Sequence, residues 1–208
     1  MASTRNYWRE RVGSILAVVP LGVWTVIHLW NNLYGFAGAD AWEEHVTTYS
    51  HPLSQALIFA IVLGPLVYHA IWGLRRIFIG RPNNMVQRNY PNLKFLLQRV
   101  SAVGVLLFIG AHLWLAMFQP RFTTGHAERF ADISHEMHHH MPTLVVYLLG
   151  TLGVAYHLAN GLETFLMKLG IRWPRKMSDS LETPFLVLFV VLLAMSWGAI
   201  YALYSAGA

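Results

Sequence analysis

Residues 53–79 read LSQALIFAIVLGPLVYHAIWGLRRIFI, and the side chains are mostly apolar until a pair of arginines near the end. A helix rises about 1.5 Å per residue, so a stretch of this length crosses the roughly 30 Å hydrocarbon core of a bilayer. The apolar part contains one ionisable residue, His69. The stretch therefore predicts a membrane-spanning helix that carries a histidine.

The rest of the chain contains four further stretches of this kind. Together the predicted spans are residues 12–34, 53–79, 96–118, 142–169 and 183–204. Of the 208 residues, 55 % are hydrophobic and 12 % are charged, against about 25 % charged in soluble domains. The period-two alternation of a membrane β-barrel is absent. We expect an all-α fold, an integral membrane five-transmembrane-helix bundle that forms a single membrane domain over residues 1–208.

The first stretch also has features of a signal peptide. It follows a basic start, and the small residues Ala37, Gly38 and Ala39 resemble a cleavage site. Its apolar run is longer than a signal core, however, and it contains polar side chains such as His28 and Asn31. These features favour a retained spanning helix.

The distribution of charge predicts the orientation. Of the 15 Lys and Arg residues, 13 lie before the first span, between the second and third, or between the fourth and fifth. The loop between the first two spans is acidic and has neither Lys nor Arg. The positive-inside rule therefore places the N-terminus in the cytoplasm. The basic residues are expected to anchor the helices in the membrane and to leave a basic cytoplasmic face for a soluble partner, rather than to bind nucleic acid.

Each of the first four predicted spans carries one histidine: His28, His69, His112 and His157. Ionisable residues inside a bilayer are costly and usually functional. Counting the helical rise from the cytoplasmic edge places His28 and His112 at about 24–25 Å, and His69 and His157 at about 13–16 Å. The four histidines therefore form an outer pair and an inner pair, each at matching depth.

Two depth-matched histidine pairs are the ligand pattern of two haems, because one haem iron takes an axial imidazole on each face. Gly73 and Gly161 each follow a histidine by four residues and so share its helix face, where a flat macrocycle needs room. Arg76 lies on the face of His69, nearer the cytoplasm, and is a candidate partner for a haem propionate. Alternative readings are interhelical hydrogen bonding, a proton relay and a histidine-lined transporter of haem or metal ions.

A second histidine cluster lies in SHEMHHHMP, residues 134–142, before the fourth span. It lacks the cysteines and the acidic spacing of a closed zinc site. We interpret it as a hydrated interfacial segment that titrates near neutral pH, with proton exchange near a quinone as the alternative.

Four sequence motifs around these histidines resemble a known family. They are RVGSILAVVPLGVWTVIHLWNN (11–32), LGPLVYHAIWGL (63–74), LQRVSAVGVLLFIGAHLW (97–114) and YHLANGLETFLMKLGI (156–171). With them the chain resembles the dihaem cytochrome b membrane anchor of succinate:quinone oxidoreductase, respiratory complex II, in its single-subunit five-helix form.

The resemblance implies two haem b cofactors, a distal one on His28 and His112 and a proximal one on His69 and His157. It also implies a flavoprotein subunit and an iron–sulfur subunit on the cytoplasmic face of a bacterial plasma membrane. The absence of cysteine agrees with this, since the clusters then lie on another chain. Ala155 stands where related fumarate reductases have a proton-carrying glutamate, which favours succinate oxidation.

The electron acceptor implied by the resemblance is a quinone, menaquinone, reduced toward the outer side. Candidate contacts at the outer end are Trp30, Asn31, Asn32, Glu43, Glu44, His45 and Trp114. Candidates for a second site or for propionate contacts at the inner edge are Arg11, Ser14, Gln98, Arg99 and Ser101. A dihaem anchor of another dehydrogenase, such as a hydrogenase or a formate dehydrogenase, is the closest alternative function.

Overall fold

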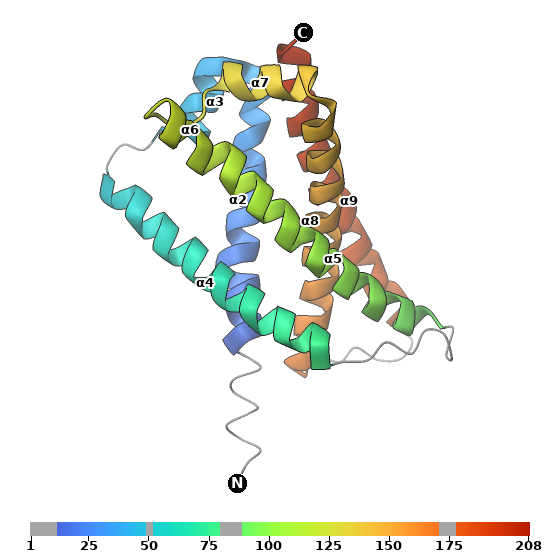
Figure 1. Cartoon of the computed structure of the whole chain (residues 1–208). Helices are drawn as coiled ribbons and strands as arrows, with labels where there is room; N and C mark the ends of the chain where they lie inside the picture. The colour runs from blue at the N-terminus through green and yellow to red at the C-terminus, as the bar shows by residue number, and fades with distance from the viewer. Residues whose placement is uncertain (1–11, 49–51, 80–88, 171–177) are drawn as a thin grey trace.

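A computed structural model describes residues 12–48, 52–79, 89–170 and 178–208. Within these residues the structure has five helical segments long and apolar enough to cross a membrane, which confirms the predicted multi-pass all-α fold. The segments are Val12–Ala37, Gln55–Ile79, Tyr90–Thr123, Met141–Met167 and Thr183–Ala206. Figure 1 shows them as one bundle, with short helices covering one end.

The first and third spans each change helical geometry along their length. The first comprises a π-helical turn η1 (Ala17–Gly22), α2 (Val23–Asn32) and a 3-10 turn η2 (Leu33–Ala37). Pro20 lies inside η1, where its missing N–H and its ring disturb the regular hydrogen-bond ladder. The third comprises α5 (Tyr90–Leu113), the π-helical η3 (Trp114–Phe118) and α6 (Gln119–Thr123).

The third predicted span, approximately residues 96–118, lies within a longer helical segment, because α5 begins at Tyr90. The Asn89 side chain accepts a hydrogen bond from the Asn92 amide, and a proline stands in the first turn, both of which favour a helix start. Lys94, which lies outside the predicted span, is therefore helical like Arg99. Their long apolar stems allow them to lie within the first turns of a spanning helix.

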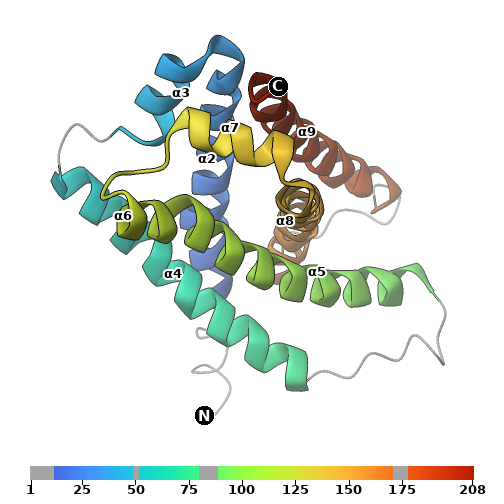
Figure 2. The ribbon, with the colours of Figure 1, turned by 45° about the horizontal axis from the view of Figure 1, so that its top comes forward.

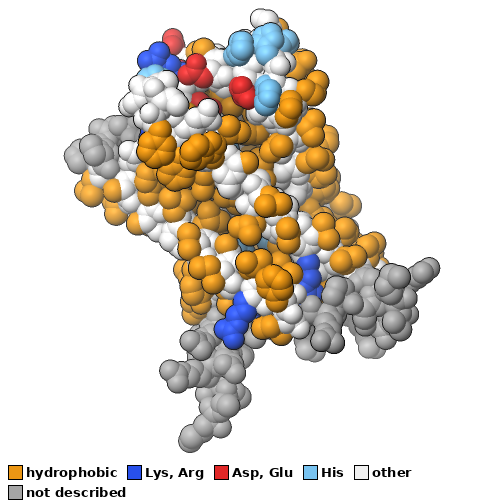
Figure 3. Space-filling model, viewed as in Figure 1, with side chains coloured by type: hydrophobic (Ala, Val, Ile, Leu, Met, Phe, Trp, Pro, Cys, Tyr) orange, Lys and Arg blue, Asp and Glu red, His pale blue; other side chains and the backbone are white. Residues whose placement is uncertain are grey.

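The other three spans are formed by α4 (Pro52–Ile79), α8 (Met141–Lys168) and α9 (Ser178–Ala206). The first described residues of the chain lie at the end of the bundle opposite the C-terminus (Figure 1). In Figure 3, the lower end shows Lys and Arg side chains, while the upper end shows the His, Asp and Glu side chains together with a further Lys or Arg. A broad apolar band separates them, as expected for a membrane protein.

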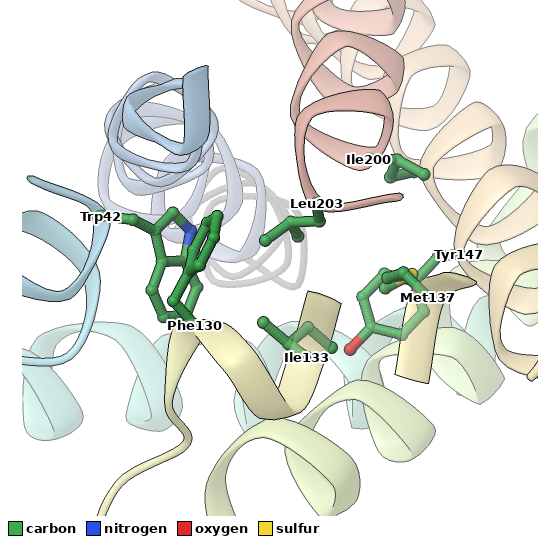
Figure 4. Close-up of a cluster of buried hydrophobic side chains, with 7 residues drawn as sticks. All are labelled: Trp42, Phe130, Ile133, Met137, Tyr147, Ile200 and Leu203. Atoms are coloured by element: carbon green, nitrogen blue, oxygen red, sulfur yellow. The ribbon is translucent and has the colours of Figure 1, made fainter. Parts of the chain in front are cut away.

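Two short helices, α3 (Ala39–Val46) and α7 (Phe130–His139), cover the end of the bundle that carries the C-terminus. Gly38 begins α3 with a φ of 100°, a conformation that favours glycine. Under these helices lies the main cluster of buried apolar side chains, shown in Figure 4. Its members are Trp42, Phe130, Ile133, Met137, Tyr147, Ile200 and Leu203.

Glycines allow the long helices to approach closely. A Cβ atom at Gly150 of α8 would overlap the ring of Phe108 on α5, and one at Gly13 would lie 3.1 Å from the Trp72 ring on α4. Small residues have this role in membrane bundles, where helix association depends on close packing. Contact between α5 and α8 is extensive, whereas α4 touches the rest mainly along the first span and stands apart in Figure 2.

Candidate functional site

The structure brings His28 of α2 and His112 of α5 together near the covered end of the bundle. Their ring centroids are 5.8 Å apart, with an angle of 65° between the ring planes. Each ring is held by an aromatic neighbour on its own helix: Trp24 stacks on His28, and Phe108 stacks on His112. The predicted outer pair thus consists of neighbouring side chains from different spans.

The inner pair is also close in space. The rings of His69 on α4 and His157 on α8 have centroids 6.3 Å apart and planes at 63°. Trp72, one turn along α4, lies 6.2 Å from His69. Four helices therefore contribute one histidine each, and each pair joins two helices that are far apart in the sequence.

Both pairs fit the axial ligation of a haem iron. A metal–imidazole bond is about 2 Å long and the ring centre lies about 1 Å behind the nitrogen, so two imidazoles on one iron have centres roughly 6 Å apart. The two observed separations are 5.8 Å and 6.3 Å. In an axial pair both ring planes contain the metal–nitrogen axis, so an angle of about 60° between them is compatible with ligation.

The second ring nitrogen of two of these histidines has a defined partner. The His112 Nδ1 atom lies 3.1 Å from the hydroxyl of Tyr147, and the His157 Nδ1 atom lies 3.2 Å from both Ser101 Oγ and Gln98 Nε2. Where Nδ1–H donates to a hydroxyl oxygen, Nε2 is left unprotonated and available to a metal, which is the usual arrangement around metal-bound histidine.

Gln98 and Ser101, predicted as inner quinone or propionate contacts, therefore contact the inner histidine. The Ser101 hydroxyl donates to the Gln98 carbonyl at 3.0 Å, so its oxygen remains free to accept from the imidazole N–H. Gln98 Nε2 donates to the His157 carbonyl at 3.2 Å, and Gln98 Oε1 accepts from Asn160 at 2.6 Å. No sequence pattern had indicated Asn160 or Tyr147, because each reaches its partner across a helix interface.

Two arginines lie near the inner pair. Arg99 donates to the Arg76 carbonyl at 3.3 Å, and its guanidinium lies 3.7 Å from the centre of the Phe95 ring. The Arg76 guanidinium lies 4.9 Å from the centre of the Trp72 ring. Of the other inner candidates, Ser14 is buried, and Arg11 lies outside the described residues.

The glycines beside the inner histidines differ in their surroundings. A Cβ at Gly73 would meet nothing within 4 Å, whereas one at Gly161 would lie 3.5 Å from Gln98 Nε2. The α4 side of the inner pair therefore has more open space than the α8 side.

Among the outer quinone candidates, several polar groups are engaged within the chain. Asn31 donates to the His45 carbonyl at 3.0 Å, and Glu43 accepts from the Phe130 amide at 3.0 Å. Asn32 donates to the His28 carbonyl at 2.8 Å and accepts from Trp42. The exposed candidates are Glu44, His45, Trp30 and Trp114.

Trp30 lines a hollow of about 390 Å³ at the covered end of the first span. The other lining residues are Leu33, Tyr34, Phe36 and Ala37. The His45 ring stacks on Tyr34 with centroids 3.7 Å apart. This mostly apolar hollow is an open depression formed by residues of the first span.

The histidine-rich segment forms α7 and its junction with α8. His140 Nδ1 lies 2.9 Å from Glu136 Oε1, which also accepts from Thr143 at 2.8 Å. His138 Nδ1 lies 2.9 Å from the Tyr204 carbonyl of α9. In the described part of the chain, no group of three or more His, Cys, Asp or Glu side chains could hold a metal ion by itself.

Fold and site together define a class: integral membrane helical bundles with two histidine pairs at different depths, each pair joining two spans. A family model described as "Succinate dehydrogenase/Fumarate reductase transmembrane subunit" matches residues 80–198. The chain is also similar to the succinate dehydrogenase cytochrome b558 subunit of Bacillus subtilis (strain 168), with 31 % identity over 210 residues, 97 % of this chain and 99 % of that protein. The chain therefore belongs to the family of succinate dehydrogenase/fumarate reductase transmembrane subunits, as the resemblance of its motifs predicted.

Proposed function

We propose that this chain is the cytochrome b membrane anchor of a succinate dehydrogenase complex and that it holds two b haems. The observation that carries the proposal is the pair of interhelical histidine contacts, with ring centroids 5.8 Å and 6.3 Å apart. The named relative is itself a cytochrome subunit of succinate dehydrogenase. The family match also favours this complex over a hydrogenase or formate dehydrogenase anchor and over a transporter.

In this proposal His28 and His112 bind the outer haem, and His69 and His157 bind the inner one. A haem of this kind supplies reversible one-electron transfer at its iron. The protein holds the two pairs about 10 Å apart along the membrane normal, as estimated from the helical rise. The chain thereby provides two electron-transfer positions between the cytoplasmic edge and the outer end of the bundle.

The groups around the inner pair suit a haem with two carboxylate substituents. Gly73 leaves open space beside His69, and Gly161 adds no side chain beside His157. Arg76 and Arg99 lie close together at the inner edge, where their charges can pair with propionates. Neutralising two adjacent cations would stabilise this region of α4 and α5.

The proposed partners are a flavoprotein subunit that oxidises succinate and an iron–sulfur subunit that passes electrons to this chain. They dock on the basic end of the bundle, which we place in the cytoplasm by the positive-inside rule. The whole chain, residues 1–208, acts as one membrane domain in a bacterial plasma membrane. Since the chain contains no cysteine, iron–sulfur clusters belong to the partner.

The proposed electron acceptor is a quinone, menaquinone, bound in the hollow at the covered end of the first span. Trp30, Tyr34 and Phe36 provide apolar walls, and the stacked His45 adds a polar group at the rim. Electrons delivered to this end leave the negative cytoplasmic side and cross most of the membrane toward the positive side, so the membrane potential favours their transfer by about 2.3 kcal/mol per charge per 100 mV. Succinate oxidation in intact cells should therefore slow when an uncoupler collapses the potential, and an unchanged rate argues against an outer quinone site.

The haem assignment is tested on the purified complex by reduced-minus-oxidised spectra and pyridine haemochrome quantitation. We expect about two b haems per chain from four axial ligands. His112→Ala should remove only the outer species and His157→Ala only the inner one. His126→Ala, in the outer loop, is the matched control and should keep both haems. A purified complex with one haem or none, or a His112→Ala variant that retains both, contradicts the proposal.

A further inference from the structure

Tyr147 is a buried residue of α8 that contacts an outer histidine from another helix. Its hydroxyl oxygen lies 3.1 Å from His112 Nδ1, and its ring meets the His112 ring edge-on with centroids 5.7 Å apart. The side chain is 8 % exposed. A phenol buried at this depth needs a hydrogen-bond partner, and the imidazole is the partner that the structure provides.

The packing around Tyr147 holds this contact in place. The Tyr147 ring also meets Phe108 edge-on, with centroids 5.4 Å apart and planes at 86°. Gly150, one turn further along α8, lets Phe108 lie against the helix backbone. On its other side Tyr147 belongs to the buried apolar cluster under α7, which includes Met137 (Figure 4). The hydroxyl therefore has little freedom to leave His112.

The inner pair provides a contrast. There, His157 Nδ1 lies 3.2 Å from the Ser101 hydroxyl oxygen and 3.2 Å from the Gln98 amide nitrogen, which can only donate. The outer imidazole meets a phenol in an apolar setting, whereas the inner one meets an aliphatic hydroxyl within a polar network. The two histidines thus have chemically different partners for the same ring nitrogen.

We propose that Tyr147 is a positioning residue for His112. Its phenol oxygen accepts a hydrogen bond from Nδ1–H and so fixes the orientation of the imidazole. This hydrogen bond lowers the reduction potential of the outer haem. The inference rests on the proposed ligation of that haem by His112. An imidazole that donates its N–H becomes a more electron-rich ligand, which favours the oxidised iron. The hydroxyl acts through His112 and need not contact the haem.

The test is a redox titration of the purified complex with Tyr147→Phe, which keeps the ring and removes the hydroxyl. Loss of an outer-shell partner typically changes metal-site equilibria about tenfold or more. A tenfold change of the redox equilibrium in favour of the reduced haem corresponds to a rise of about 59 mV in its one-electron reduction potential. We expect this rise for the outer haem, an unchanged inner potential, and a changed low-spin ferric EPR signal of the outer haem.

Tyr156→Phe is the matched control. It removes a hydroxyl from the same helix, its ring packs against Phe189 of α9, and its hydroxyl has no hydrogen-bond partner among the described residues. Both potentials should stay unchanged in this variant. An outer potential that is unchanged or lower in Tyr147→Phe, at full haem content, overturns the positioning role. A wild-type complex without a haem that depends on His112 contradicts the proposed function itself. The failure of the positioning role and the failure of the proposed function are therefore distinguishable.

Discussion

Gly150 provides a sharp test of how α5 and α8 pack. A Cβ atom at this position would overlap the Phe108 ring, and the three atoms nearest to it all belong to that ring. Replacing Gly150 with alanine should therefore force Phe108 away from α8. Because Phe108 stacks on His112, with centroids 5.8 Å apart, the displacement should also disturb the outer histidine pair.

Two opposing effects determine how much Gly150→Ala changes the free energy of unfolding. Inserting a methyl group into a well-packed site typically costs about 1–3 kcal/mol. Replacing glycine with alanine within a helix gains up to about 1 kcal/mol through backbone entropy. Gly104→Ala on α5 isolates the second effect, since a Cβ there would meet nothing within 4 Å. We expect Gly150→Ala to be about 1–3 kcal/mol less stable than Gly104→Ala.

The assay is unfolding in mixed detergent micelles by increasing sodium dodecyl sulfate, followed by far-ultraviolet circular dichroism. Adding Phe108→Leu to Gly150→Ala makes room for the methyl group and should recover part of the loss, which a double-mutant cycle measures. Equal stability of Gly150→Ala and Gly104→Ala would refute the close contact between Phe108 and α8. A cycle without coupling would show that the loss has another cause.

Three further predictions concern other parts of the molecule. Lys94 and Glu163 form a 2.6 Å ion pair between α5 and α8, with side chains 20 % and 15 % exposed. Lys94→Met should destabilise the bundle by roughly 2 kcal/mol in the same assay. Adding Glu163→Leu should restore most of this stability, because the unpaired charge is then removed. Burial and two nearby carboxylates of α7 raise the pKa of Glu128 to about 8. This pKa exceeds the unfolded value of about 4.3, so the stability that the protonated group contributes at low pH is lost as the pH rises toward 8. Glu128→Gln should flatten the pH dependence of thermal unfolding over that interval, and an unchanged profile would contradict the raised pKa. Since the chain has no cysteine, Thr124→Cys and Leu169→Cys can be labelled singly; in intact cells an impermeant maleimide should react with the first and spare the second, and the reverse result would invert the proposed orientation.

The SHEMHHHMP segment is more deeply buried than its sequence predicted. The sequence suggested a hydrated interfacial stretch, yet Met137 is fully buried and Ser134 is 2 % exposed, while His135 and His139 are exposed. The segment is an amphipathic helix that places one face on the bundle end. Its other face carries the histidines that appear at the top of Figure 3.

Sequence alone determined the number of spans, the four intramembrane histidines and their division into two depths. These properties depend on hydropathy and on the constant rise per residue, which are local to each helix. The tertiary structure decided which side chains meet across helices: Tyr147 with His112, Ser101 with His157, and Phe108 with Gly150. Such contacts depend on how two helices are rotated, how they cross and how closely they approach. Side-chain packing between the helices determines these three quantities, and the apolar pattern of a single span does not encode them.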